Sequence, residues 1–337
     1  YFLSFTGPVA EASRSGNVRS QVHFFVKKNG STAIPTAKTS STYIRHDSDH
    51  TESSGHLHIL LPSLSTNDYV EVYAKAFDTS ANTLSLGTTS LFLEKVASSR
   101  TIFSGTAIRT VSSTNLNEVN PSALQWTQEI ADSGFTHSNT SNSHNITLDA
   151  AGAYLVFANL PIKSNTGRAS PQMQIKLNGT QVTGGFASQG YIRTAEATNK
   201  SSIHWVGLIQ SASTNQVLTI EMSKRAEAGT VDVQTNEHGS IFIEKLANTN
   251  NLFSATATQL TSGDNWNNGS DVKWATQETI DTGKFTHSTS SNPNQIVVDS
   301  DGDYLLLYND GLTSTIARAN PKMMVKVNGN NVPGAEV

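Results

Sequence analysis

The chain has 337 residues, no cysteine and a formal net charge of −4, and only 15% of its residues are charged. This near-neutral balance lacks the clustered lysine and arginine that nucleic-acid binding requires. The missing cysteines exclude a disulfide framework, a thiolate nucleophile and Cys-ligated zinc. Serine, threonine and asparagine make up 110 residues, while 36% of the chain is apolar, so the composition is not that of a disordered protein. The longest apolar runs fall far short of the ~20 residues that cross a bilayer, and we expect no membrane insertion.

Strands are the predicted secondary structure throughout the chain. Segments 172–177, 217–222 and 240–246 alternate apolar and polar residues, and the first of them stops at the turn Asn178-Gly179. Alternation with a period of two is typical of half-buried strands, whereas few windows show the helical spacing of apolar residues. Short β-branched and aromatic runs separated by Asn, Gly, Ser and Thr turns are typical of a sandwich or barrel. The sequence therefore predicts an all-β fold.

An internal repeat of 150 residues organises these strands, as the corresponding residues Phe103 and Phe253 illustrate. The recurring segments are 102–107 with 252–257, 135–138 with 285–288, 146–154 with 296–304, Arg168 with Arg318, and Asn178-Gly179 with Asn328-Gly329. The start of the chain matches the later part of the same unit. The matching residues are Tyr1 with Tyr154, Arg19 with Arg168, Asn29 with Asn178, Tyr43 with Tyr191, His56 with His204, and Phe92 with Phe242.

The repeat divides the chain into three predicted domains. Residues 1–98 form the C-terminal part of one unit, 101–247 form a complete unit, and 252–337 form the N-terminal part of a third. A domain without its first strands would expose a sheet edge, which is costly and prone to aggregation. The two partial units overlap in the stretch that they cover, so they are not simple complements. We therefore expect these residues to be a window from a longer tandem array.

The complete unit carries a spaced motif of Ile146, Asp149, Gly152 and Tyr154. This motif, the later Asn-Gly turn and the strand at 239–243 resemble the pattern of C1q-like globular domains. Asp149 stands where that family has a proline, and the family's Gly-Asp turn is imperfect here. The resemblance implies tandem C1q/TNF-like jelly-roll β-sandwiches, and the alternative is another ten-strand sandwich with convergent turns.

The resemblance also implies a homotrimer whose jelly rolls pack around an axis through buried aromatic and aliphatic strand faces. Phe157, Phe186, Tyr191 and Trp205 exceed what one alternating core face needs, which supports burial between subunits. The alternative for each of them is the core of its own unit. Tandem units that each trimerise would stack into a fibre held by many modest interfaces.

Candidate chemistry is sparse. The sequence has no Gly-x-Ser-x-Gly, no glycine-rich phosphate loop and no His-Glu-x-x-His, and no acidic pair recurs between units, so we expect no enzymatic activity. His46, His50, His56 and His58 are the candidate metal ligands, because His56 and His58 would project from one face of a strand. The corresponding stretch of the complete unit keeps one histidine, His204, so a polar loop is the competing interpretation.

Arginine recurs in all three units, at Arg19, Arg168 and Arg318. We interpret it as a clamp on a loop carbonyl or carboxylate at a subunit boundary, with carbohydrate or carboxylate binding as the alternative. Calcium would use acidic residues of the third unit if it bound, although no loop follows a known calcium pattern, and we expect no cofactor. These residues are Asp264, Asp271, Asp301 and Asp303.

Three functional classes remain open. The first is a structural or adhesive array with self-association as its main contact, in a virion fibre or a bacterial surface filament, and therefore extracellular. The second is a recognition module for carbohydrate or another ligand, for example a glycan of the host surface. The third is an enzyme such as a polysaccharide depolymerase. The repeat, the short linkers and the Ser/Thr/Asn-rich composition favour the first class.

Overall fold

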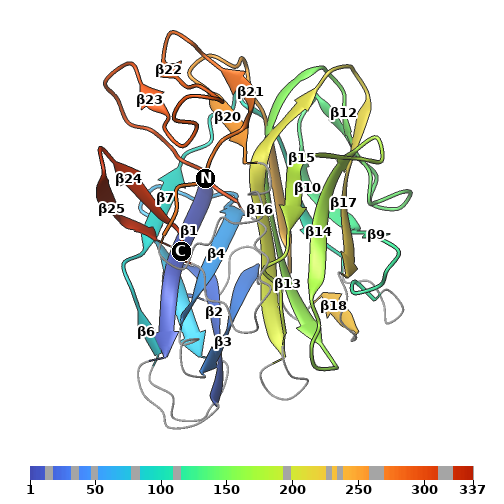
Figure 1. The fold of residues 1–337 in the computed structure, drawn as a ribbon. Coiled ribbons are helices and arrows are strands. Elements are labelled where there is room, and N and C mark those ends of the chain that lie inside the picture. The colour runs from blue at the N-terminus through green and yellow to red at the C-terminus, as the bar shows by residue number, and fades with distance from the viewer. Residues whose placement is uncertain are drawn as a thin grey trace.

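The computed structural model describes residues 1–11, 18–31, 38–46, 52–76, 84–108, 115–192, 199–224, 230–233, 238–257, 269–309 and 322–336. Every regular element in these ranges is a β-strand. The second unit lies beside the first, and the third lies above and along the first in Figure 1. Among the described residues, no helix is long and apolar enough to span a membrane.

The second unit is a sandwich of two antiparallel sheets. Its strands are β8 (Thr101–Ala107), β9 (Ser122–Ala123), β10 (Trp126–Ala131), β11 (Phe135–Thr136), β12 (Ile146–Leu148), β13 (Gly152–Ser164), β14 (Pro171–Leu177), β15 (Thr180–Ala187), β16 (Lys200–Ser211), β17 (Gln216–Lys224), β18 (Val231–Val233) and β19 (Ser240–Lys245). One sheet has the order β10-β8-β19-β13-β16 and the other the order β11-β12-β17-β14-β15. Because the chain crosses repeatedly between the two sheets in this order, the unit is a jelly roll. The all-β jelly-roll prediction is confirmed.

The core of the second unit lies between these sheets and follows from strand alternation. Met173 and Ile175 on β14 are fully buried, as the alternating pattern predicts. Trp205 also packs in this core, and its indole Nε1 donates to the carbonyl oxygen of Gly184 at 2.9 Å. Of the two interpretations of Trp205, burial in its own unit is therefore the one observed. Tyr191, by contrast, is exposed, and Phe186 is half-buried.

The first unit keeps the arrangement that the second unit has from β13 onward. Its strands are β1 (Phe2–Glu11), β2 (Val18–Lys28), β3 (Thr39–His46), β4 (Glu52–Leu60), β5 (Val70–Ala76), β6 (Leu84–Leu86) and β7 (Ser90–Glu94). β1 pairs with β4, β6 and β7, and β2 pairs with β3 and β5. A second apolar core fills the space between these sheets, with Leu3, Phe24 and Leu57 fully buried. The pairing of β7 with β1 corresponds to that of β19 with β13.

The third unit forms three short strand pairs in its described residues. Its strands are β20 (Phe253–Thr256), β21 (Thr276–Ile280), β22 (Phe285–Thr286), β23 (Val297–Val298), β24 (Met324–Val327) and β25 (Asn330–Glu336). Local contacts repeat those of the second unit. The rings of Phe285 and Tyr304 meet edge-on at 5.8 Å, and those of Phe135 and Tyr154 do so at the same distance.

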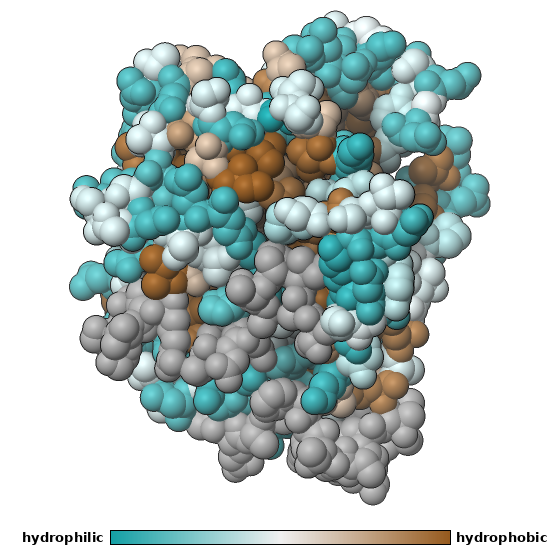
Figure 2. Space-filling model, turned by 180° about the vertical axis from the view of Figure 1, so that it is seen from behind, coloured by the Kyte–Doolittle hydropathy of each residue, from teal (hydrophilic) through white to brown (hydrophobic). Residues whose placement is uncertain are grey.

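Burial nevertheless differs between equivalent positions of these two units. Tyr154 is fully buried, whereas Tyr304 is 44% exposed and the neighbouring Leu305 is 56% exposed. Figure 2 shows hydrophobic residues gathered near the upper middle of the rear face, with hydrophilic residues around them.

An Asn-Gly turn closes the corresponding hairpin in each unit. In the second unit Asn178 has φ 49° and Gly179 has φ 78°, and the turns at Asn29 and Asn328 show the same signs. Positive φ at both central residues defines the type I′ turn, whose twist matches that of the flanking strands. The predicted positive-φ turns are confirmed.

The turn at Asn178-Gly179 allows the cost of backbone strain to be measured apart from the cost of packing. A Cβ added at Gly179 meets nothing within 4 Å, so Gly179→Ala should cost about 1 kcal/mol through its positive φ alone. Chemical denaturation measures this cost. Gly283→Ala is the control, because Gly283 does not have positive φ and its added Cβ makes only an ordinary 3.4 Å contact. Equal losses in the two variants would contradict the turn assignment.

Candidate functional site

The candidate site is the contact between the first and second units. Strands β3 and β4 lie against β13, β16 and β19. Six buried apolar residues form an inter-unit cluster where these strands meet, namely Phe2, Leu60, Ile102, Phe157, Val206 and Phe242. The ring of Phe2 lies 4.5 Å from that of Phe157 and 4.7 Å from that of Phe242. The cluster is separate from the cores of both units.

Strand geometry explains why β13 contributes to two apolar layers. Successive side chains on a strand point to opposite faces of the sheet. Val156 therefore faces the core of its own unit, while Phe157 faces the first unit. A sheet with one face in water alternates apolar and polar residues, but β13 is buried on both faces over most of its length. Phe157 thus lies between two units of one chain, whereas the sequence predicted for it burial between subunits.

Three histidines lie beside the inter-unit cluster. The imidazole of His56 stacks on that of His204 at 3.7 Å, and His58 lies 5.4 Å from the ring of Phe157. The hydroxyls of Thr6 and Ser4 meet Nδ1 of His56 and His58 at 3.2 and 3.0 Å.

These histidines are held in the neutral form. Burial lowers the pKa of His56 to about 3, with a further contribution from His58, and burial lowers the pKa of His58 to about 4. Burial, together with His56 and His58, also places the pKa of His204 well below its usual value. His58 and His204 are buried and His56 is half-buried, so an imidazolium at these positions would lose hydration.

Hydrogen bonds also join the two units. Asn159 Nδ2 donates to the carbonyl oxygen of Thr39 at 2.8 Å. Three more contacts involve backbone groups: Ser41 N to Ser202 Oγ at 2.7 Å, Ser240 Oγ to His58 O at 2.8 Å, and Gln21 Nε2 to Lys200 O at 3.0 Å. Buried polar groups need such partners, so these bonds fix the register of the two sandwiches.

A buried ion pair lies at one side of the interface. Lys38 Nζ is 2.6 Å from Glu129 Oε2, and the Lys38 side chain is fully buried. The Glu129 carboxylate also accepts hydrogen bonds from Ser104 and Thr106. Burial lowers the pKa of Lys38, and Glu129 opposes that shift. Burial raises the pKa of Glu129, but the charge and the hydrogen bonds of Lys38, with those of Thr106 and Ser104, outweigh it and leave the pKa below its usual value.

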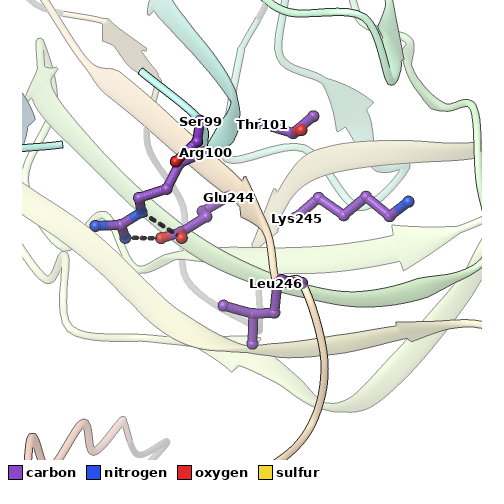
Figure 3. Close-up of a pocket in the computed structure, with 7 residues that line it drawn as sticks. Ser99, Arg100, Thr101, Glu244, Lys245 and Leu246 are labelled. Carbon is purple, nitrogen blue, oxygen red and sulfur yellow. Dashed lines mark hydrogen bonds and ion pairs between the residues drawn. The ribbon is translucent and has the colours of Figure 1, made fainter. Parts of the chain in front are cut away.

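A second ion-pair group surrounds a pocket at the linker between the units (Figure 3). The pocket has a volume of about 270 Å³ and is lined by residues 99–101 and 244–247. The Arg100 guanidinium donates to both oxygens of Glu244 and, at 2.5 Å, to Glu94. These hydrogen bonds, above all the ones that Arg100 donates to Glu244, raise the pKa of Arg100. Because Arg100 and Glu244 are bound to each other, they tie β7 to β19 instead of offering a free charge to a ligand.

Of the four histidines predicted as metal ligands, the structure describes the side chains of His56 and His58. His56 and His58 project from the same face of β4, as expected for alternate residues, and both face the second unit. His46 ends β3, but its side chain and the whole of His50 lie outside the described residues. Within the described ranges, no group of three or more histidines and carboxylates has the geometry to hold a metal ion.

The three recurring arginines do not share one environment. Arg19 lies in β2 and is half-buried, and its Nε has no hydrogen-bond partner. Arg168 is exposed in the bend before β14 and has φ 62°, and Arg318 lies outside the described residues. Arg19 and Arg168, the two that the structure describes, therefore occupy different environments.

The acidic residues that calcium would use are only partly described. Asp271 accepts a hydrogen bond from Asn294 at 2.9 Å. Asp264 lies outside the described residues, whereas Asp301 and Asp303 lie within them.

Sequence reasoning missed Lys38, Glu129 and Asn159 as interface residues. A signal was present for Glu129, because Gln128-Glu129 recurs in the third unit as Gln277-Glu278. Glu278 also accepts hydrogen bonds from Ser254 and Thr256, which correspond to Ser104 and Thr106. A repeated carboxylate beside repeated hydroxyls therefore marks the same local cradle.

Comparison with known proteins adds little beyond the strand order. No family model and no curated protein matches the chain. Murine APRIL at pH 8.0 aligns over 43% of this chain and 98% of its own, with 11% identity and a TM-score of 0.30. Eiger TNF from S. frugiperda aligns over 48% of this chain and 98% of its own, with 12% identity and a TM-score of 0.31. A chain from the structure of infectious bursal disease virus Gx strain aligns over 72% of this chain and 56% of its own length, with 12% identity and a TM-score of 0.20. The jelly-roll assignment accordingly rests on the sheet order of the second unit.

The buried histidines predict a loss of stability in mild acid. Their folded-state pKa values lie below the ordinary 6.5, so the unfolded chain binds protons first as the pH falls. Each histidine should lower the free energy of unfolding by about 1.4 kcal/mol between pH 7.5 and 5.5. Urea denaturation at both pH values measures the change. His56→Phe/His204→Phe keeps stacked rings and removes two titrations, so an unchanged pH dependence in this variant would refute the assignment.

The buried ion pair predicts that substitutions of Lys38 and Glu129 have strongly non-additive effects on the free energy of unfolding. Lys38→Met should cost about 3 kcal/mol, because it leaves Glu129 partly buried beside the interface without its cation. Glu129→Gln should be similarly costly, and the double variant should recover much of the loss. Lys176→Met is the control, since Lys176 pairs with Glu221 within one sheet and should cost less than about 1 kcal/mol. Additive losses in the double-mutant cycle would show that Lys38 and Glu129 act independently.

Proposed function

We propose that this chain is a structural or adhesive protein, in which tandem jelly-roll units pack on one another and carry out no chemistry. The observation that carries the proposal is the inter-unit cluster, in which Phe2 packs against Phe157 and Phe242. A flexible string of recognition domains would keep polar surfaces between its members. Here six apolar residues are buried where the sheets of the two units meet, as in the core of a permanent interface.

The most perturbed titratable groups also support a structural role. Strongly shifted pKa values often mark catalytic sites, but only where a cleft admits a substrate. His56, His58 and His204 lie between the sheets of two units, and their neutral rings serve the packing. Lys38 and Glu129 are likewise used to join the units.

The setting belongs to the same proposal. A protein of this kind works outside the cell, as part of a virion fibre or a bacterial surface filament. Low charge density, the Ser/Thr/Asn-rich composition and the absence of cysteine support such a setting. Host-surface glycans are the ligand class that an adhesive array would meet.

Solution scattering combined with functional assays tests the proposal on the full chain. Packed units should give a radius of gyration of about 20 Å. Phe157→Asp should increase it, because a carboxylate would be buried in the inter-unit cluster. Val119→Asp, at an exposed position of the second unit outside that cluster, is the comparison and should leave the radius unchanged.

The functional assays separate the three classes. The proposal expects no release of sugar from bacterial polysaccharides above the blank. Sugar release would make the protein an enzyme. Glycan binding that Phe157→Asp abolishes would fit an adhesive array that needs its packed units, whereas saturable binding unaffected by Phe157→Asp would make the protein a recognition module. Sugar release or such unaffected binding would overturn the structural proposal.

A further inference from the structure

Residues at the same position of the repeat contact one another across units. Such contacts indicate how the units are related by symmetry. His56 and His204 occupy the same position of the repeat, and their rings stack at 3.7 Å. In a cyclic arrangement with head-to-tail contacts, a residue touches its own equivalent only near the rotation axis. The histidine stack therefore places an axis of pseudosymmetry between β4 and β16.

The inter-unit cluster has the same property. Phe242 belongs to it and Phe92, the equivalent residue of the first unit, packs against it. Phe2 and Leu155 form a second equivalent pair in and around the cluster. The third unit also reaches it, since Leu307, the equivalent of Phe157, packs there. A single apolar cluster thus collects corresponding positions from all three units.

One hydrogen bond occurs at both successive boundaries. Asn159 Nδ2 donates to Thr39 O at 2.8 Å between the first and second units. Asn309, the equivalent of Asn159, donates through Nδ2 to Phe186 O at 3.1 Å between the second and third units. The acceptor Thr39 lies four positions before Tyr43, and the acceptor Phe186 lies five positions before the equivalent residue Tyr191. The second unit therefore contacts the third nearly as the first contacts the second.

Neighbouring contacts strengthen this correspondence. In the second unit the Glu129 cradle, with Thr106, receives Lys38 from the first unit. In the third unit Thr256, the equivalent of Thr106, lies 3.3 Å from the Cβ position of Gly184 of the second unit. Gln210 Nε2 also donates to Thr279 Oγ1 across this second boundary, at 2.7 Å.

The third unit also touches the first. Lys322 Nζ lies 3.5 Å from Glu52 Oε2. The Cβ position of Gly334 lies 3.4 Å from Thr88 Cγ2 and 3.5 Å from Thr89 O. Gly334 is the equivalent of Gly184, the residue that approaches the third unit from the second. Gly184 of the second unit thus faces the third unit, and Gly334 of the third unit faces the first. These contacts close a ring of three units.

We propose that the three repeats of this single chain occupy the three positions around one pseudo-threefold axis, so that the partner surface of each jelly roll is filled by the next repeat of the same polypeptide. This goes beyond the proposed function and does not depend on it. Identical chains are not needed to bury the inter-unit faces, because Phe157, Phe242 and their equivalents already cover one another. The covalent linkers act as the source of a high effective concentration.

The mass of the full chain in solution is the first test. Analytical ultracentrifugation should give the 36.1 kDa of one chain at micromolar concentration. A species of three times that mass would overturn the proposal, because it would place copies of one unit around each axis.

Engineered cysteines provide the second test, since the chain has none of its own. His56→Cys/His204→Cys should cross-link within one chain on oxidation or with a short bismaleimide, and Gln210→Cys/Thr279→Cys should cross-link with the bismaleimide at the second boundary. Light and 15N-labelled chains, refolded together, should give cross-linked peptides that are all light or all heavy. Mixed peptides would overturn the proposal.

His204→Cys alone is the matched control. Because each chain then carries a single cysteine beside its own proposed axis, the single variant should remain monomeric after the same treatment. Efficiently cross-linked dimers would indicate an axis shared by copies of the second unit and would overturn the proposal. If a variant fails to fold, the mass of the unmodified chain still decides the question. None of these outcomes bears on sugar release or glycan binding, so a failure here is distinguishable from failure of the proposed function.

Discussion

The packing of one sandwich face onto another is the constraint from which the rest of the structure follows. Once Phe157 and Phe242 project from the outer face of their sheet, that face must be covered, because apolar area in water is costly. Covering it removes water from every polar group nearby. Asn159 and Lys38 therefore take partners from the neighbouring unit, whereas His56 and His58 contact the hydroxyls of Thr6 and Ser4 in their own unit. The hydrogen bonds across the interface are thus a consequence of the apolar contact.

The two classes of contact have different roles. The apolar cluster provides attraction without direction, since the hydrophobic effect scales with area. The hydrogen bond from Asn159 to Thr39 and the ion pair of Lys38 with Glu129 have narrow geometric requirements, and they select one register among many. Arg100 adds a third constraint close to the linker, where it holds Glu94 and Glu244 together.

Much of the fold was predictable from the sequence. The alternation of 172–177, the Asn-Gly turns and the repeat are local signals, and each led to a correct strand or turn. The interface was predictable only in part. Phe157 was recognised as a surplus aromatic residue, but so was Trp205, which packs in its own core. Alternation gives the face of a strand, but it does not tell which of two apolar faces meets a neighbour. The partnership of Lys38 with Glu129 joins residues 91 positions apart and leaves no local pattern.

Corresponding positions of the repeats have diverged in residue type. The position that is Phe157 in the second unit is Ser4 in the first and Leu307 in the third. In a ring of identical subunits, a single genetic change is imposed three times and must be tolerated at every boundary. Where the members of the ring are encoded separately along one chain, each boundary can acquire its own residues, and a change at one leaves the other two intact. The histidine stack of His56 and His204 can therefore be particular to a single boundary, with different chemistry at the others.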